Sequence, residues 1–217
     1  MLISPKKYSK KFSYLSGRGR TVISGADIEY IPDFLDIKFA NRSLEELVAK
    51  VKWSQPKLQI FGRTVPSPRL SAWYGDKDSV YRYSGLINKP LPWLPNLLFL
   101  KNLIEELLRC PFNSVLLNLY RSGSDSMGWH RDNEPELGQN PVIASVSLGG
   151  IRRFLLRSRE KSHRRTIECQ PQNGSLLIMR GDTQRLWRHC VPKTRELVQP
   201  RLNLTFRQIL LDENYVR

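Results

Sequence analysis

Short apolar runs separated by turn residues fill the chain from residue 113 onward, and they restrict the folds that it can adopt. Each run has the length of a β-strand. The runs follow one another at the spacing of an all-β sandwich or jelly roll and not of βαβ units. We therefore expect strands over residues 114–120, 142–148, 153–157, 166–169, 175–179, 187–191 and 202–209.

Two helices are expected before these strands. Ser43 stands ahead of two glutamates, as an N-cap residue stands ahead of an acidic first turn, and this predicts a helix to about Trp53. Leucines at helical spacing predict a second, strongly amphipathic helix from Leu97 to Leu108. The expected fold is of the α+β class and mainly β: a double-stranded β-helix (jelly roll) with these helices buttressing one outer face.

The N-terminal residues differ in composition from the rest, since residues 1–20 carry six basic residues and no acidic one. Such a segment is typical of a mobile, solvated tail, and an arm that touches phosphates is the alternative. The chain of 217 residues is long enough for one domain with a substantial core and too short for two. We predict a basic N-terminal extension at residues 1–20 and a single domain at residues 21–217.

The triplet His130-Arg131-Asp132, together with the distant His189, offers two imidazoles and one carboxylate. A strand turns residues two apart to the same side, so His130 and Asp132 are expected to hold one ion while Arg131 points away. Such a set with open coordination positions is the signature of non-haem Fe(II) oxygenases, because oxygen and a reducing co-substrate need free positions. An H-x-D triplet alone is weak evidence, since ordinary salt bridges also produce it.

Polar and apolar residues alternate strictly from Arg201 to Arg207, so Arg201, Asn203, Thr205 and Arg207 share one face of a strand. Two arginines on an inward face require anions. A dicarboxylate supplies them, because a guanidinium group binds a carboxylate through two parallel hydrogen bonds that lysine cannot copy. A solvated edge strand is the alternative for this heptad alone, and the metal triad makes the buried cradle the better interpretation.

With further motifs, these residues resemble the AlkB-type Fe(II)- and 2-oxoglutarate-dependent dioxygenases. The resemblance runs from about Phe61 to Ile209, and the order and spacing of its motifs are similar to those of the DNA-repair branch. Its carriers are the motifs at residues 61–63, 74–76, 81–85, 118–120, 130–134, 145–149, 187–189 and 201–207.

The resemblance implies a dioxygenase domain that oxidises N-alkyl groups of damaged bases, such as N1-methyladenine and N3-methylcytosine in DNA, and releases succinate, CO2 and an aldehyde. Fe(II) would be held by His130, Asp132 and His189. The co-substrate 2-oxoglutarate would be bound at its distal carboxylate by Arg201 with help from Tyr120. The other expected co-substrate residues, which bind the carboxylate near the metal, orient Asp132 or line the pocket, are Asn118, Asn203, Thr205 and Arg207.

A base cannot be oxidised while it is stacked in a duplex, so the enzyme must flip it or use single strands. Tyr81 and Tyr83 lie on one strand face and could stack a base against His130, although such a pair is also ordinary β-sheet content. The resemblance makes Tyr83 the stacking aromatic. It also makes the segment 61–63 (Phe61, Gly62, Arg63) a hairpin whose apolar tip wedges into the duplex.

Two residues after the H-x-D triplet bear on the choice of base. The resemblance gives Glu134 a contact with the exocyclic amine of the base. Asn133 stands where relatives that act on duplex DNA often have a second aspartate, and its amide lacks the charge that favours a cationic base. The preferences for duplex or single strand and for methyl or larger groups therefore stay open.

The net charge of +15 favours a polyanionic partner, and DNA is expected, with RNA as the alternative, beside O2. One segment concentrates this charge, and it is interpreted either as a grip on phosphates or as a solvated hairpin. Its basic residues are Arg152, Arg153, Arg157, Arg159, Lys161, Arg164 and Arg165.

Three scattered cysteines without a C-x-x-C motif argue against a disulfide framework and favour a reducing compartment. Cys190 is expected to pack in the core, and His163 to lie on the surface. No apolar run approaches the length of a membrane span, so we expect a cytoplasmic protein without a membrane partner. The sequence carries no signal for the oligomeric state, and a monomer is the default expectation. The alternatives are an RNA demethylase or a protein hydroxylase on the same scaffold, or a non-catalytic nucleic-acid-binding module with a structural metal.

Overall fold

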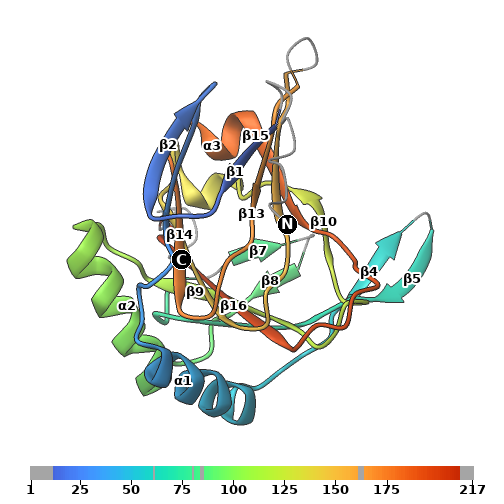
Figure 1. The fold of residues 1–217 in the computed structure, drawn as a ribbon. Helices are drawn as coiled ribbons and strands as arrows, with labels where there is room; N and C mark the ends of the chain where they lie inside the picture. Colours follow the sequence, from blue (N-terminus) through green and yellow to red (C-terminus); the bar gives the residue numbers. More distant parts are fainter. Residues whose placement is uncertain (1–11, 61, 80, 84–85, 161–163, 211–217) are drawn as a thin grey trace.

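Two β-sheets that face each other form the body of the protein (Figure 1). The computed structural model describes residues 12–60, 62–79, 81–83, 86–160 and 164–210. The smaller sheet has the strand order β1 (Phe12–Leu15), β13 (Thr166–Cys169), β12 (Phe154–Ser158), β15 (Trp187–Val191), β10 (Met127–His130). The larger sheet has the order β2 (Gly19–Ile23), β3 (Ala26–Ile31), β14 (Ser175–Arg180), β11 (Ile143–Gly149), β16 (Arg201–Arg207), β9 (Ser114–Tyr120), β6 (Leu70–Gly75).

Apolar side chains fill the space between the two sheets, because each strand turns alternate residues inward. Tyr30 and Leu177 from the larger sheet pack in one buried cluster with Leu156 and Trp187 from the smaller sheet. The two sheets together have the architecture of a jelly roll. All pairings of named strands are antiparallel except that of β1 with β13.

Two helices, α1 (Ile37–Lys50) and α2 (Pro95–Leu108), cover the outer face of the larger sheet (Figure 1). Leu47 of α1 and Leu100 and Ile104 of α2 are fully buried, in one cluster with Val146 and Leu204 of the sheet. A third, short helix α3 (Thr183–Leu186) lies between β14 and β15, and a 3-10 turn η1 spans Pro135–Leu137. Helices α1 and α2 therefore buttress the larger sheet.

Two hairpins stand apart from the sheets. β4 (Lys57–Ile60) and β5 (Arg63–Pro66) form a hairpin that projects from the body (Figure 1). Gly62 at its turn has φ +75°, a left-handed conformation that glycine adopts without strain. β7 (Tyr81–Tyr83) and β8 (Leu86–Asn88) form the second hairpin.

The structure confirms the predicted fold class and each expected strand to within a few residues at its ends. The predicted start of the first helix at Ser43 is wrong. The helix begins at Ile37, because Asp36 accepts hydrogen bonds from the amides of Lys38 and Phe39 and so caps it. Ser43 lies inside this helix with a fully buried side chain.

Part of the predicted N-terminal extension belongs to the sheets. Residues 12–15 pair with β13 as strand β1, and residues 19–23 pair with β3 as strand β2. Residues 1–11 and His163 lie outside the described residues, so the expectations for them stay predictions. Cys190 is buried as expected, and the three cysteines are free thiols. Within the described ranges, no helix has both the length and the apolar character needed to cross a membrane.

Candidate metal centre and its cavity

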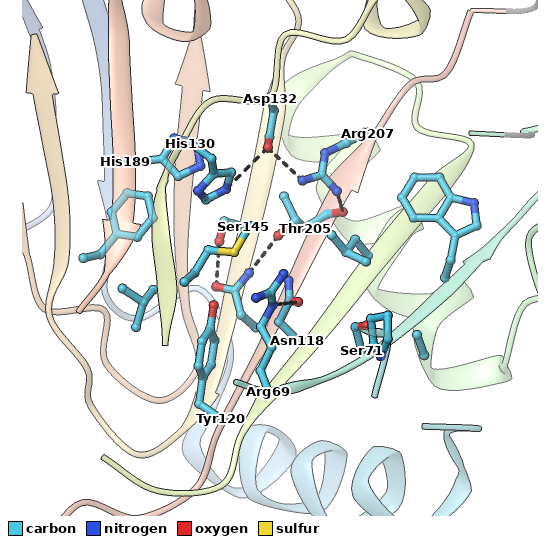
Figure 2. Close-up of a pocket in the computed structure, with 18 of the residues that line it drawn as sticks. Arg69, Ser71, Asn118, Tyr120, His130, Asp132, Ser145, His189, Thr205 and Arg207 are labelled. Atoms are coloured by element: carbon cyan, nitrogen blue, oxygen red, sulfur yellow. Dashed lines mark hydrogen bonds and ion pairs between the residues drawn. The ribbon is translucent and has the colours of Figure 1, made fainter. Parts of the chain in front are cut away.

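His130, Asp132 and His189 meet between the two sheets, at the edge of the smaller one (Figure 2). His130 ends the edge strand β10 and lies opposite His189 of β15, with ring centroids 4.2 Å apart and ring planes at 68°. One ligand atom from each of the three residues lies within 4.8 Å of the other two. The predicted convergence of these distant segments is therefore confirmed.

The prediction that His130 and Asp132 share one face of a strand is wrong, because strand β10 ends at His130 and does not reach Asp132. The backbone N–H of Asp132 donates instead to the side-chain oxygen of Gln184, at 3.0 Å. Its carboxylate accepts a hydrogen bond at Oδ2 from Nη2 of Arg207, at 2.7 Å. The other oxygen, Oδ1, lies 3.8 Å from Nε2 of His130.

The charge states of Asp132 and His189 are those of metal ligands. Burial alone would raise the pKa of Asp132, but Arg207, His189 and His130 hold it well below its ordinary value, so the carboxylate is ionised. Burial, with a smaller effect of His130, lowers the pKa of His189 to about 3, so its imidazole is neutral. Nδ1 of His130 lies 2.9 Å from the carbonyl oxygen of Gly128, and with its proton there, Nε2 keeps a lone pair for a metal.

A cavity of about 160 Å³ opens beside this triad and is walled by β6, β9, β11 and β16 of the larger sheet. Five of the six residues predicted to bind the co-substrate line it. They are Asn118, Tyr120, Asn203, Thr205 and Arg207. On the cavity floor, Ser145, Asn203 and Thr205 form a hydrogen-bonded series, in which Ser145 Oγ donates to Asn203 Oδ1 at 3.0 Å and Asn203 Nδ2 donates to Thr205 Oγ1 at 2.7 Å (Figure 2).

Arg201, the sixth residue, does not line the cavity but lies next to the floor residue Asn203 on the same face of β16, and it is 1% exposed. Its Nη2 donates to Ser147 Oγ at 2.8 Å and to Asn203 Oδ1 at 2.6 Å, both neutral acceptors. Its Nε and Nη1 are buried without a hydrogen-bond partner among the described residues. Its guanidinium carbon lies 5.6 Å from the ring centroid of Tyr120. A buried cation with unsatisfied donors fits an anionic ligand, and a carboxylate is the planar anion that it binds best.

Arg69 is a cavity residue that the sequence reasoning missed. It is buried in the segment before β6, and its Nε donates to Oδ1 of Asn118 at 2.8 Å. No periodicity marks it. Only the pairing of β6 with β9, in which Leu70 lies opposite Leu119, brings it to the cavity.

None of the predicted substrate residues whose side chains the structure describes lines the cavity. Phe61 and the side chains of Tyr81 and Tyr83 lie outside the described residues. Gly62 and Arg63 are exposed at the turn of the β4–β5 hairpin, whose base reaches the cavity through Pro56 and Lys57. Asn133 is exposed and Glu134 is half-buried, with a buried Oε2 that has no hydrogen-bond partner among the residues described.

The described part of the basic segment 152–165 divides into two groups, and Lys161 lies outside the described residues. Arg152 is buried and donates to the carbonyl oxygens of Ser122, Asp125 and Pro192, so neither a grip on phosphates nor a solvated hairpin holds for this residue. Arg153 is held by Glu168 through two hydrogen bonds, the shorter at 2.8 Å. Both residues therefore have a structural role.

The second group, which we call the arginine pocket, lies on the outer face of the smaller sheet. Trp129 and Arg188 are the chain neighbours of His130 and His189, and they point to the opposite face. The guanidinium carbon of Arg157 lies 4.3 Å from the ring centroid of Trp129. The described residues that line this pocket include no acidic side chain; they are Trp129, Arg157, Ser158, Arg159, Arg164 and Arg188.

Comparison with known proteins agrees with this geometry. The profile of the 2OG-Fe(II) oxygenase superfamily matches residues 27–207. The chain is 43% identical over 189 residues to the alpha-ketoglutarate-dependent dioxygenase alkB homolog 3 of Mus musculus, with 83% of this chain and 65% of that protein aligned. It is 42% identical over 175 residues to the DNA oxidative demethylase ALKBH2 of Mus musculus, with coverages of 78% and 73%.

The fold is similar to that of a solved structure, OsALKBH1. The two share a TM-score of 0.57 at 17% identity, over 88% of this chain and 100% of that one. The chain spans about two thirds of the length of the curated alkB homolog 3 proteins that it matches, 65% for the mouse protein.

Proposed function

Because this chain belongs to the 2OG-Fe(II) oxygenase superfamily, and within it to the AlkB homologues, we propose that it removes alkyl groups oxidatively from nucleic-acid bases. The reaction uses Fe(II), 2-oxoglutarate and O2, and its biological result is repair of alkylated DNA. One observation carries the proposal: the His130, Asp132 and His189 triad adjoins a cavity, and the buried cation of Arg201 lies next to the residues that line it. A structural metal would require the triad but not this cation.

Nε2 of His130, a carboxylate oxygen of Asp132 and a ring nitrogen of His189 would hold the Fe(II) ion. Three protein ligands of this kind would leave coordination positions open for the co-substrate and for O2. Iron and 2-oxoglutarate, when bound, supply the oxidation of an alkyl carbon by O2, with succinate and CO2 as co-products. Arg207 holds Oδ2 of Asp132 and so leaves Oδ1 on the side of the imidazoles.

The co-substrate would lie along the floor of the cavity, with its two carboxylates toward opposite ends. Arg201 and the phenol of Tyr120 bind the distal carboxylate, since Nε and Nη1 of Arg201 need acceptors. Asn118, Asn203, Thr205 and Arg207 line the path from there to Asp132. Burial raises the pKa of Tyr120, against the effects of Arg201, Arg69 and Arg152, so its hydroxyl keeps the proton that it donates to the carboxylate.

Nucleic acid binds over the mouth of this cavity. The β4–β5 hairpin, with Phe61, Gly62 and Arg63 at its turn, inserts at the lesion, and its base already borders the cavity. Tyr83, with Tyr81 on the same strand, stacks the base against His130, while Glu134 and Asn133 contact its edge. The arginine pocket receives backbone phosphates, because four guanidinium groups meet there without an acidic lining residue. This basic surface fits a nucleic acid better than a protein substrate.

The test is incubation with Fe(II), ascorbate, 2-oxoglutarate and oligonucleotides that contain N1-methyladenine or N3-methylcytosine. Single-stranded DNA, duplex DNA and RNA are compared, and the products are weighed by mass spectrometry. We expect loss of the methyl group with release of succinate, and neither change with Asp132→Ala. Succinate release with every oligonucleotide left intact would contradict base dealkylation, and preference for the RNA would assign the enzyme to RNA.

A further inference from the structure

The metal ligand Asp132 lies beyond the last residue of its strand. The pairing of β10 with β15 ends with His130 opposite His189, and β10 is the edge of its sheet. The backbone N–H of Asp132 is buried, so it needs an acceptor that the sheet does not provide. Gln184 provides it, since its Oε1 lies 3.0 Å from that nitrogen.

Both polar atoms of the Gln184 side chain, Oε1 and Nε2, have hydrogen-bond partners. The residue is 1% exposed. Its Nε2 donates to the sulfur atom of Met179, at 3.4 Å, so its oxygen must face Asp132. Met179 belongs to β14 and also lines the cavity, which places the whole connection beside the metal centre.

Helix α3, which carries Gln184, is itself fastened to the larger sheet. Thr183, its first residue, is 1% exposed and accepts a hydrogen bond at Oγ1 from the backbone N–H of Asp27 in β3, at 2.8 Å. The same hydroxyl donates to the carbonyl oxygen of Arg180 at the end of β14, at 2.5 Å. The main chain at Asp132 is thus linked to the larger sheet through Gln184 and α3.

We propose that Gln184 is a positioning residue for the metal centre: it fixes the main chain at Asp132, while Arg207 fixes the carboxylate. The proposal rests on the iron centre of the proposed function. With the main chain and one carboxylate oxygen both held, the other oxygen is kept on the side of the two imidazoles before a metal arrives. Without Gln184, the segment after His130 has no such restraint at Asp132, and metal binding must order it.

The test measures Mn(II) affinity in the absence of 2-oxoglutarate and nucleic acid, by electron paramagnetic resonance of the free ion. Gln184→Met keeps the length of the side chain and removes the oxygen acceptor. We expect it to raise the Kd for Mn(II) about tenfold or more, the usual effect of losing a hydrogen bond that orients a metal ligand. Gln184→Glu keeps an oxygen for the Asp132 amide and should restore a Kd near that of the wild type.

Ser175→Ala is the control, because it removes a buried side-chain hydrogen bond, from Ser175 Oγ to the carbonyl oxygen of Gln172, that involves neither α3 nor Asp132. We expect it to lower the melting temperature and to leave the Kd for Mn(II) unchanged. An unchanged Kd in Gln184→Met, an equal rise in Ser175→Ala, or a failure of a folded Gln184→Glu to restore binding would each overturn the proposal. Absence of Mn(II) binding by the wild type would instead contradict the proposed iron centre.

Discussion

Arg207 and Asp132 form a buried ion pair that divides the two carboxylate oxygens between different tasks. Oδ2 of Asp132 accepts from Arg207 at 2.7 Å, whereas Oδ1 faces Nε2 of His130 at 3.8 Å. The side chains are 5% and 7% exposed. One oxygen is thus held by the protein, and the other remains for a metal.

We predict that Arg207→Met lowers the free energy of unfolding by about 3 kcal/mol and weakens metal binding, because it leaves a buried carboxylate without its cation. Denaturant unfolding of the metal-free protein measures the first effect. The matched control is Arg153→Met, which breaks the pair with Glu168 in which the arginine side chain is 53% exposed. This control should cost about 1 kcal/mol or less. Equal losses in the two variants would contradict the assigned role of Arg207.

Arg201 is expected to set the affinity for the co-substrate. Arg201→Met should raise the KM for 2-oxoglutarate about 100-fold, since it removes charge-assisted hydrogen bonds worth about 3 kcal/mol. Arg201→Lys should recover little of this, because an ammonium group cannot offer the planar pair of donors. The control Arg121→Met removes an arginine that pairs with Asp125 outside the cavity. A KM in Arg201→Met close to that of the wild type would show that the distal carboxylate binds elsewhere.

The arginine pocket is expected to account for part of the salt dependence of nucleic-acid binding. Arg188→Glu reverses an exposed charge in this pocket and should weaken oligonucleotide binding about tenfold, with a smaller slope of log Kd against log salt. Fluorescence anisotropy at several salt concentrations gives both quantities. Arg42→Glu makes the same change at an exposed residue of α1. This helix covers the outer face of the larger sheet, whereas the arginine pocket lies on the outer face of the smaller one. If Arg42→Glu reduces affinity as much as Arg188→Glu, the effect is one of net charge and not of this pocket.

Glu168 is expected to contribute to acid unfolding. Its hydrogen bonds with Arg153 are the main cause that lowers its pKa from the ordinary 4.5. The unfolded chain therefore takes up this proton at a higher pH than the folded protein does. The stabilisation is complete above about pH 4.5 and is lost as the pH falls through the lower folded value. Denaturant unfolding at pH 7 and at pH 4 should show a smaller difference for Glu168→Gln than for the wild type, and an equal difference would contradict the assignment.

Local patterns determined most of the fold and the identity of the metal ligands. The apolar runs gave the strands, since alternation and turn residues are properties of neighbours along the chain. The heptad from Arg201 to Arg207 forms β16, and three of its polar residues, Asn203, Thr205 and Arg207, line the cavity as the alternation predicted. The triad of His130, Asp132 and His189 was recognisable because its residue types suit only a few kinds of chemistry.

Only the tertiary structure decided how these groups are held. Gln184 and Asp132 are 52 residues apart, Arg69 and Asn118 are 49 apart, and Arg152 reaches a carbonyl oxygen 30 residues away. Each of these buried polar groups finds its partner on another element, and no spacing in the sequence encodes that pairing. The sequence therefore determined which residues could bind iron and a dicarboxylate. The packing of α3 against the sheets and the pairing of β6 with β9 decided which other residues hold them in place, because a buried donor or acceptor must be satisfied by whatever the fold brings beside it.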